Sequence, residues 1–402
     1  MEIIQAQNSV LHAGLRLVET GLIARTWGNV SCRVDAESFV ITPSGRSYQS
    51  LTANDLVQVK IDDLSFKGSI KPSSEKGVHA EVYKLYPEVN FVIHTHQENA
   101  SVIAATALKA IPVGGANSML GEEVLCADYA LPGTRALRKN VRRVLMQSRG
   151  QAVIMKHYGA LCFGRDAEEA FAMAIALEKV CADHVINQYL KLSGGKAYDP
   201  YALAAFALGQ KKAALSNRLQ SEGKPASERR EKLGQNGMDG AKEGAIIDEQ
   251  RIAERLAEAG LYQTIYQRNP QINAIIFKAS PELQCLSRAG VGLKPLLDDF
   301  AQIVGLQVRT FDQKEPDRIA RALRKSAAVL IKDSGALCCG VSEDDAKAVA
   351  MILQKNANAL IGAVLFGKVQ PINAFESMLM RFVYLKKYAK QAFVSGTESR
   401  RQ

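Results

Sequence analysis

A thirteen-residue stretch occurs twice in this chain, and this repeat constrains the fold more than any other feature. AVIMKHYGALCFG at residues 152–164 recurs as AVLIKDSGALCCG at residues 328–340, with eight of thirteen positions identical and no gap. An acidic, alanine-rich segment follows each copy, and residues 86–100 before the first copy align with residues 269–283 before the second. A repeat of this length predicts two copies of one domain.

The two copies differ in their histidines. Three histidines of the first copy are replaced in the second, where His94, His96 and His157 align with Phe277, Ala279 and Asp333. The second half of the chain contains no histidine, although the apolar pattern of its strands is kept. The fold therefore does not require histidine at these places, and the three positions are special in the first copy.

Hydrophobic periodicity predicts several short strands and longer helices. Helical spacing extends over residues 1–20, 75–86 and 166–190, with Asp166 as a cap, and strand patterns cover residues 29–34, 38–45, 56–62 and 89–95, with two more inside 152–164. The irregular alternation of strands and helices predicts an α/β or α+β layered fold.

Residues 209–246 have a different composition from the rest of the chain. They are rich in charge, contain glycine and serine, and have no sustained apolar period. We expect a flexible linker there, and a partly formed charged helix over its first turns is an open alternative. This division predicts a first domain at residues 1–208, a shortened second domain at 247–395 and a tail at 396–402.

The composition is that of a soluble globular protein, with 402 residues, 47% hydrophobic residues and a net charge of +10. No aromatic-rich basic motif or zinc-finger spacing supports nucleic-acid binding, whereas an anionic small substrate suits the basic balance. Seven scattered cysteines without a CxxC pair favour a reduced, cytoplasmic protein. We expect no signal peptide and no membrane span.

The strand at residues 89–95 leads into two histidines that suggest a metal site. Residues i and i+2 of a strand project to the same face, so His94 and His96 form a natural pair of divalent-metal ligands. The alternative is a strand end with one surface histidine and one core histidine. The third histidine, His157, and the nearby Glu75, with its tunable pKa, favour metal and proton-transfer chemistry.

Three polar loops accompany these histidines. Ser73 and Ser74 precede Glu75 at the predicted start of a helix, where they could cap the helix or bind an anion. Gly28 and Asn29 lie in a second loop, and Ser44 and Gly45 lie in a third. Each of the last two is an ordinary turn by itself, but together the three loops could form a phosphate cradle.

These motifs, in their order, resemble a known family. TWGNVS, ITPSG, KPSSE, VIHTHQ and KHYGAL are similar to the successive motifs of the class II aldolase/adducin family, over roughly residues 5 to 200. The resemblance implies a three-layer αβα fold with a central mixed or antiparallel sheet flanked by helices, here in tandem. The second copy resembles a shortened relative that lacks TWGNVS, ITPSG and PSSE.

The resemblance also implies roles for individual residues. His94, His96 and His157 match histidines that bind a divalent metal, usually Zn²⁺, with Mn²⁺, Co²⁺ or Fe²⁺ as alternatives. Glu75 matches the acidic residue that moves a proton. The remaining matches are phosphate- or substrate-binding positions, namely Gly28, Asn29, Ser44, Gly45, Ser73 and Ser74. Tyr129 is a further candidate, for which a core position is the alternative.

The implied activity is that of an aldehyde-lyase. It would cleave a phosphorylated ketose to dihydroxyacetone phosphate and an aldehyde through a metal-stabilised enediolate. A dehydratase, a decarboxylase or an epimerase could use the same site, although the family's epimerase has Asp where this chain has Glu75. A non-catalytic, adducin-like scaffold is the alternative from another class. The family also implies a homo-oligomer with sites at domain or subunit interfaces. The loss of all three histidines predicts that the second copy binds no metal of its own.

Overall fold

The computed structural model describes residues 2–20, 22–23, 27–114, 119–221, 249–258 and 260–398. The chain divides into two compact units. The first comprises Met1–Gln188 with Phe366–Lys368, and the second comprises Tyr189–Leu365 with Val369–Gln402.

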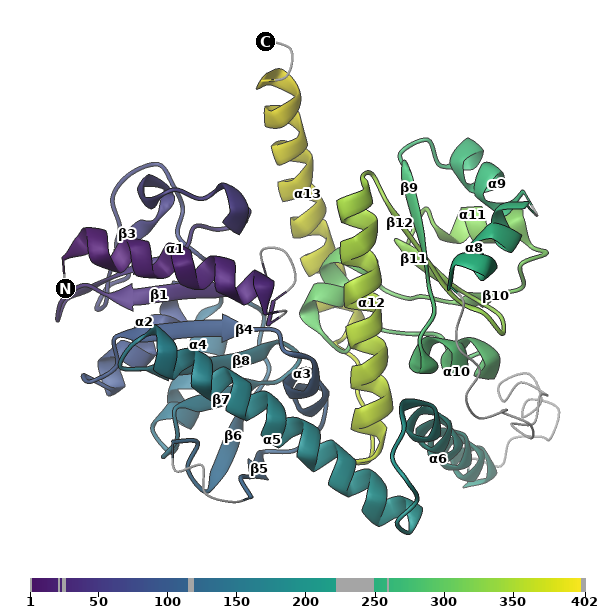
Figure 1. Cartoon of the computed structure of the whole chain (residues 1–402), viewed down its shortest axis with the longest axis horizontal. Coiled ribbons are helices and arrows are strands. Elements are labelled where there is room, and N and C mark those ends of the chain that lie inside the picture. Colours follow the sequence, from purple (N-terminus) through teal and green to yellow (C-terminus); the bar gives the residue numbers. More distant parts are fainter. Residues whose placement is uncertain are drawn as a thin grey trace. The chain divides into compact units, whose positions relative to one another are not determined.

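The first unit is built on an eight-stranded sheet with the strand order β3-β2-β1-β4-β8-β7-β6-β5 (Figure 1). Neighbouring strands are antiparallel except β6 and β7, which run parallel. The sheet is therefore mixed and mostly antiparallel, as the resemblance implied. Its strands are β1 (Asn29–Arg33), β2 (Ser38–Ile41), β3 (Val57–Lys60), β4 (Phe91–Thr95), β5 (Ala110–Pro112), β6 (Glu123–Ala127), β7 (Ala152–Met155) and β8 (Gly159–Gly164).

Helices cover this sheet and bury its apolar side chains. Helices α2 and α4 share one core with the strands, in which Val82, Val141 and Phe163 are buried. Helix α1 packs against β1 and β2, and Arg16 of α1 pairs with Glu168 of α5. The helices are α1 (Ile3–Glu19), α2 (Lys76–Leu85), α3 (Glu98–Ala104), α4 (Arg135–Leu145) and α5 (Ala167–Ser193), with 3-10 turns at Tyr48–Ser50 and Ala53–Asp55.

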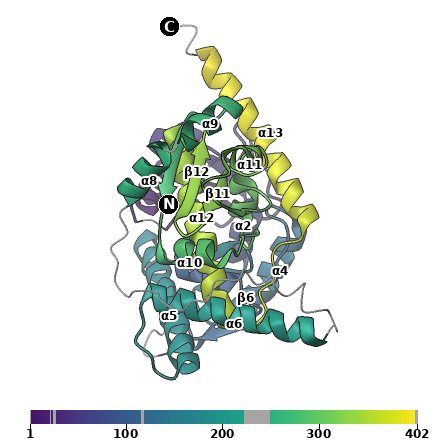
Figure 2. The same ribbon diagram turned by 90° about the vertical axis from the view of Figure 1, so that its right-hand side faces the viewer.

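The second unit contains a smaller sheet of four strands in the order β10-β11-β12-β9. Helix α12 packs against β9 and β12. Helices α9 and α11 lie beside the strands (Figure 2), and the residues between them form an apolar core. The elements are α6 (Pro200–Ser221), α8 (Glu249–Glu258), α9 (Leu261–Arg268), β9 (Ala274–Lys278), α10 (Pro281–Ala289), a π-helical turn at Phe300–Val304, β10 (Thr310–Phe311), α11 (Pro316–Ala322), β11 (Ala328–Ile331), β12 (Gly335–Gly340), α12 (Glu343–Val364) and α13 (Ala374–Glu398).

The two sheets share the same strand pairing, so the duplication extends to backbone register. His94 of β4 lies opposite Leu161 of β8, and Phe277 of β9 lies opposite Leu337 of β12. The antiparallel pair β7–β8 and its parallel neighbour β6 likewise correspond to β11–β12 and β10. The small sheet is thus the β6-β7-β8-β4 half of the large one. The expected tandem α/β architecture is confirmed.

The stretch expected to be a linker is partly helical. Residues 209–221 form the end of α6, which begins at Pro200 in the apolar segment PYALAAFAL. This agrees with the alternative of a helix over the first turns of the stretch, and residues 222–246 lie outside the described residues. Helix α13 similarly extends to Glu398, into the segment expected to be a tail.

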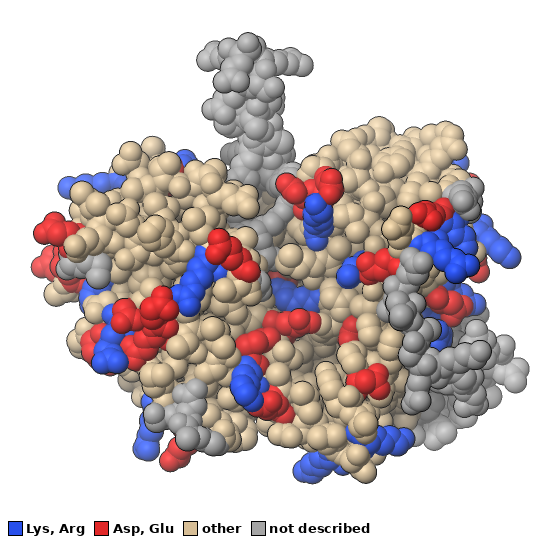
Figure 3. All heavy atoms as spheres, in the orientation of Figure 1, with Lys and Arg blue, Asp and Glu red and all other residues tan. Residues whose placement is uncertain are grey.

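Within the described ranges, no helix is long and apolar enough to cross a membrane. All seven cysteines are buried, and none of them forms a disulfide bond. On the face shown in Figure 3, acidic and basic side chains lie interspersed.

Candidate active site

Two of the three predicted polar loops lie side by side. The backbone N–H of Ser44 donates to the carbonyl of Lys71 over 3.0 Å, and the N–H of Ser73 donates to the carbonyl of Thr42 over 3.0 Å. An isolated antiparallel bridge between Pro43 and Pro72 joins the same segments. The structure therefore brings the ITPSG and KPSSE motifs together, although they are some thirty residues apart.

The second of these loops leads into α2 and places Glu75 at its start. Glu75 occupies the N-cap position, and its N–H donates to Oγ of Ser73 over 3.2 Å. The carbonyl of Ser73 accepts a hydrogen bond from the N–H of Lys76. Ser73 is buried and holds the turn, whereas Ser74 is exposed beside the loop that contains Gly133.

The remaining loop brings Asn29 next to β4. Strands β1 and β4 are neighbours, and Asn29 lies opposite His94. Gly28 has a φ of +117°, which favours glycine, and a Cβ atom there would lie 2.7 Å from the carbonyl oxygen of His94. Glycine is therefore required at this position for the loop to approach β4 so closely.

Asn29, Glu75 and His94 meet in the interior of the first unit. Oε2 of Glu75 accepts a hydrogen bond from Nδ2 of Asn29 over 2.9 Å and lies 2.5 Å from Nδ1 of His94. All three side chains are buried. Burial raises the pKa of Glu75, but the charge and hydrogen bond of His94 and the hydrogen bond of Asn29 outweigh it and lower the pKa. A buried carboxylate is thus held ionised by two donors.

The surroundings of the other ring nitrogen of His94, Nε2, show whether this residue could bind a metal. Nε2 of His94 is buried and has no hydrogen-bond partner among the described residues. A Cβ atom on Gly159 would lie 3.1 Å from this nitrogen, so glycine keeps space beside it. A carboxylate on one ring nitrogen and a free second nitrogen is the arrangement found at metal-binding histidines. His94 therefore fits a divalent metal.

His96 lies immediately after β4, two residues from His94. The centroids of the two imidazole rings are 4.7 Å apart, as expected for positions i and i+2 of a strand. The ring of Tyr158 lies against both, with centroid distances of 4.7 Å to His94 and 5.5 Å to His96. Tyr158 is buried, and it links the histidine pair to the turn that carries His157.

His157 lies in the turn between β7 and β8 with a φ of 59°. Its backbone N–H donates to the carbonyl of Ala104 in α3. The imidazole ring packs edge-on against Tyr129, with a centroid distance of 5.3 Å and an interplanar angle of 90°. The sequence candidates Tyr129 and His157 are thus neighbours, and Tyr129 has a specific contact at the candidate site.

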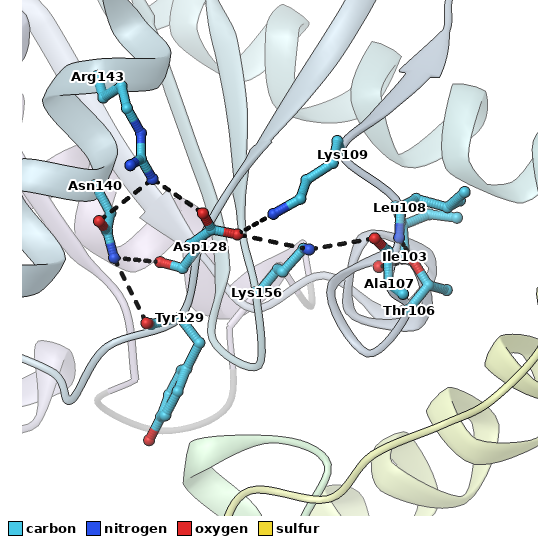
Figure 4. A network of polar contacts seen from close by, with 10 residues as sticks. All are labelled: Ile103, Thr106, Ala107, Leu108, Lys109, Asp128, Tyr129, Asn140, Arg143 and Lys156. Atoms are coloured by element: carbon cyan, nitrogen blue, oxygen red, sulfur yellow. Dashed lines mark hydrogen bonds and ion pairs between the residues drawn. The ribbon is translucent and has the colours of Figure 1, made fainter.

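A charged network anchors the segment that carries Tyr129 (Figure 4). The carboxylate of Asp128 pairs with Lys109 over 2.5 Å, with Arg143 over 2.9 Å and with Lys156, the residue before His157, over 3.8 Å. The amide of Asn140 donates to the backbone carbonyls of Asp128 and Tyr129. The hydrogen bond from Lys109 lowers the pKa of Asp128. The network therefore ties Tyr129 to the His157 turn.

Comparison with known proteins identifies the family. A family model described as "Class II Aldolase and Adducin N-terminal domain" matches residues 8–185 and 237–361, which together make up well over half of the chain. The chain belongs to this family. The two separate matches agree with the two copies seen in the sequence and in the strand register.

Several solved structures are similar to this chain. An L-fuculose 1-phosphate aldolase is 26% identical, with 46% of this chain and 87% of that chain covered and a TM-score of 0.43. The L-fuculose-1-phosphate aldolase from Thermus thermophilus is 24% identical, with 49% and 99% covered and a TM-score of 0.40. A sugar-phosphate aldolase from Thermotoga maritima is 18% identical, with 48% and 97% covered and a TM-score of 0.41.

Within this class II aldolase fold, one buried residue next to the site was not among the residues predicted from the sequence. His79 of α2 is fully buried, and its Nε2 lies 2.5 Å from Oδ1 of Asn29. Its Nδ1 lies 2.7 Å from Oγ of Ser31, which lies 2.7 Å from the hydroxyl of Tyr83. Sequence spacing could have found these residues, because Glu75, His79 and Tyr83 recur at intervals of four and share one helix face.

Proposed function

We propose that the first unit is a divalent-metal-dependent aldehyde-lyase. It would cleave a phosphorylated ketose to dihydroxyacetone phosphate and an aldehyde. Membership in the class II aldolase and adducin family supports an aldolase-type site, and the fuculose-phosphate aldolases among the similar structures suggest the substrate class. One observation carries the proposal. Glu75 is buried and bound to Nδ1 of His94, whose Nε2 remains without a partner among the described residues.

The proposed roles are those that the family resemblance implies for the individual residues. His94 and His96, with His157 from the neighbouring turn, would hold the metal. When bound, the metal supplies Lewis-acid stabilisation of the negative charge that develops on the substrate oxygens as the carbon–carbon bond breaks. Glu75 would deliver a proton to the carbon that this cleavage leaves electron-rich, and would take it back in the reverse direction.

The adjoining loops would bind the substrate phosphate. The exposed hydroxyl of Ser74 and the loops around Ser44, Gly45 and Ser73 would supply hydroxyl and amide donors of the kind that phosphates accept. Gly28 shapes the loop that carries Asn29, and Asn29 orients Glu75. Tyr129, which lies against His157, would face the substrate. Zn²⁺ suits a histidine set, and Mn²⁺, Co²⁺ and Fe²⁺ are the alternatives.

Metal analysis followed by a substrate screen tests this function. The purified full-length chain should contain about one divalent metal ion, since the second copy has no histidine, and His96→Ala should lose it. A panel of phosphorylated ketoses should then release an aldehyde and dihydroxyacetone phosphate. Stoichiometric metal with dehydration, decarboxylation or epimerisation instead would replace the lyase assignment. A chain without stoichiometric metal would favour an adducin-like scaffold.

The proposal also covers the cellular compartment, the assembly and the partners of the enzyme. We expect a cytoplasmic homo-oligomer that binds neither nucleic acid nor membrane. Sedimentation velocity of the full-length chain would show the oligomer as a single species larger than the monomer. A monomer with full lyase activity would contradict the expected assembly and leave the chemistry untouched.

A further inference from the structure

His79 and its partners connect the core of the first unit to the proposed site. We infer that His79 is a positioning residue whose Nε2–H orients the Asn29 side chain, so that Asn29 holds Oε2 of Glu75 and leaves Oε1 for the substrate. This inference rests on the proposed function, because it assigns the oxygen of Glu75 that exchanges the proton.

The contacts arise where one face of α2 meets one face of β1. Glu75, His79 and Tyr83 share a helix face through their spacing of four, and Asn29 and Ser31 share a strand face through their spacing of two. His79 lies between the two strand residues, with Nδ1 2.7 Å from Ser31 and Nε2 2.5 Å from Asn29. The five side chains form a continuous buried row that ends at Glu75.

The contact between Asn29 and Glu75, at the end of the row, determines which atom donates and which accepts in each hydrogen bond of the row. The Asn29 amide nitrogen, which can only donate, faces Oε2 of Glu75. Oδ1 of Asn29 therefore faces His79 and must accept, so Nε2 of His79 carries a proton. Burial lowers the pKa of His79 to about 3, so the ring is neutral and Nδ1 is an acceptor.

The donors and acceptors in the rest of the row can then be assigned in only one way. Since Nδ1 of His79 accepts, the hydroxyl of Ser31 donates to it, and the hydroxyl of Tyr83 donates to Ser31. Every donor in the row points toward Glu75. Without His79, Oδ1 of Asn29 would lose its donor and the amide could rotate away from Glu75. The effect of His79 on the reaction therefore passes through Asn29.

Three substitutions of His79 separate its positioning role from its packing. The side-chain amide of Gln reaches the place of Nε2, so His79→Gln keeps a donor to Asn29. The shorter amide of Asn reaches only the place of Nδ1, so His79→Asn keeps the contact with Ser31 and loses the hydrogen bond to Asn29. His79→Leu loses both contacts, and His12→Gln, at an exposed residue of α1, is the control.

We expect His79→Leu and His79→Asn to lower kcat/KM about 10- to 100-fold, as is typical when a supporting hydrogen bond of a metal site is removed. His79→Gln should lie closer to the wild type than to His79→Leu. Melting temperatures measured in parallel show whether activity follows the Asn29 contact or only the stability of the fold. Equal activity losses in the Gln, Asn and Leu variants would overturn the inference.

NMR supplies a readout that does not depend on activity. In the protein labelled with ¹⁵N-histidine and ¹⁵N-asparagine, the His79 ring should have the Nε2–H tautomer, and the Asn29 amide protons should exchange slowly with solvent. Exchange should become fast in His79→Leu and stay slow in His79→Gln. An Nδ1–H tautomer, or slow exchange in all variants, would overturn the inference. If the wild type cleaves no ketose phosphate, the proposed function fails while these spectra still decide the role of His79.

Discussion

His157 and Asp333 occupy the same position in the two copies and have nearly the same left-handed backbone conformation, with φ values of 59° and 58°. Both lie in the turn between two antiparallel strands of identical register. Asn, Asp and His are the non-glycine residues most often found in this conformation. The backbone of the turn therefore limits the choice of residue, and the chemistry of the site accounts for histidine in the first copy.

The first prediction separates these two requirements at His157. His157→Asn should keep the fold, because asparagine tolerates the left-handed conformation, but should lose a metal ligand. We expect the melting temperature of the metal-free protein to stay close to that of the wild type, while metal content and lyase activity fall. Asp333→Asn is the matched control and should change none of these quantities. Full metal content in His157→Asn would contradict the assignment of His157 as a ligand.

The second prediction concerns the close approach of Gly28 to β4. Gly28→Ala combines a positive φ with a Cβ atom 2.5 Å from Ile23 and 2.7 Å from the carbonyl of His94. Gly68→Ala is the control, since Gly68 has a φ of +92° and no atom within 4 Å of the added Cβ. Backbone strain should lower the free energy of unfolding by about 1–3 kcal/mol in either variant. Only Gly28→Ala should lose more than this, because its Cβ atom also meets close neighbours. Urea unfolding measures the difference, and equal losses would show that close packing is unimportant there.

The third prediction concerns proton transfer by Glu75. Glu75→Gln keeps the shape of the side chain but removes the proton-transfer group, so kcat should fall by about 10²- to 10⁴-fold, with the metal retained. Glu81→Gln is the matched control, because Glu81 is a buried glutamate of the same helix whose partners are Arg138 and Arg142. It should lower stability and leave kcat close to that of the wild type. Unchanged aldehyde release in Glu75→Gln would refute the role of Glu75.

The fourth prediction follows from the pKa of about 3 that burial imposes on His79. The unfolded chain binds a proton at this residue below about pH 6.5, and the folded chain does so only near pH 3. The contribution of neutral His79 to stability is therefore complete above about pH 6.5 and is lost progressively as the pH falls from there toward 3. Between pH 7 and pH 5 the loss should be about 2 kcal/mol.

Urea unfolding of the metal-free protein at the two pH values measures this loss. His79→Gln removes the titrating group, so its free energy of unfolding should depend less on pH, by about the same 2 kcal/mol. His12→Gln, at an exposed residue, should keep the pH dependence of the wild type. Parallel pH dependence in His79→Gln and the wild type would show that His79 is not held neutral in the folded state.

Much of the fold could be predicted because its signals are local. Short runs of apolar residues located β4, β7 and β8 to within a few residues, and the repeat predicted their counterparts β9, β11 and β12. The spacing of His94 and His96 predicted a shared face because a strand has a period of two. The sequence also suggested that Glu75 lies near these histidines, but its contact with Nδ1 of His94 comes from the tertiary structure.

Other contacts could not be predicted, because they depend on how distant segments pack. The spacing of four places His79 on the same helix face as Glu75, but its contact with Asn29 exists only because this face of α2 meets β1. The network of Asp128 joins Lys109, Arg143 and Lys156 from three different segments. No local period places such residues together.

The sequence by itself determined that the domain is duplicated and that only the first copy keeps histidines, since both facts are patterns along the chain. The tertiary structure decided which atoms those histidines and Glu75 contact. Hydrogen bonds require donors and acceptors within about 3 Å of each other, and only the packing of α2 and β4 against β1 brings Glu75, Asn29 and His94 that close.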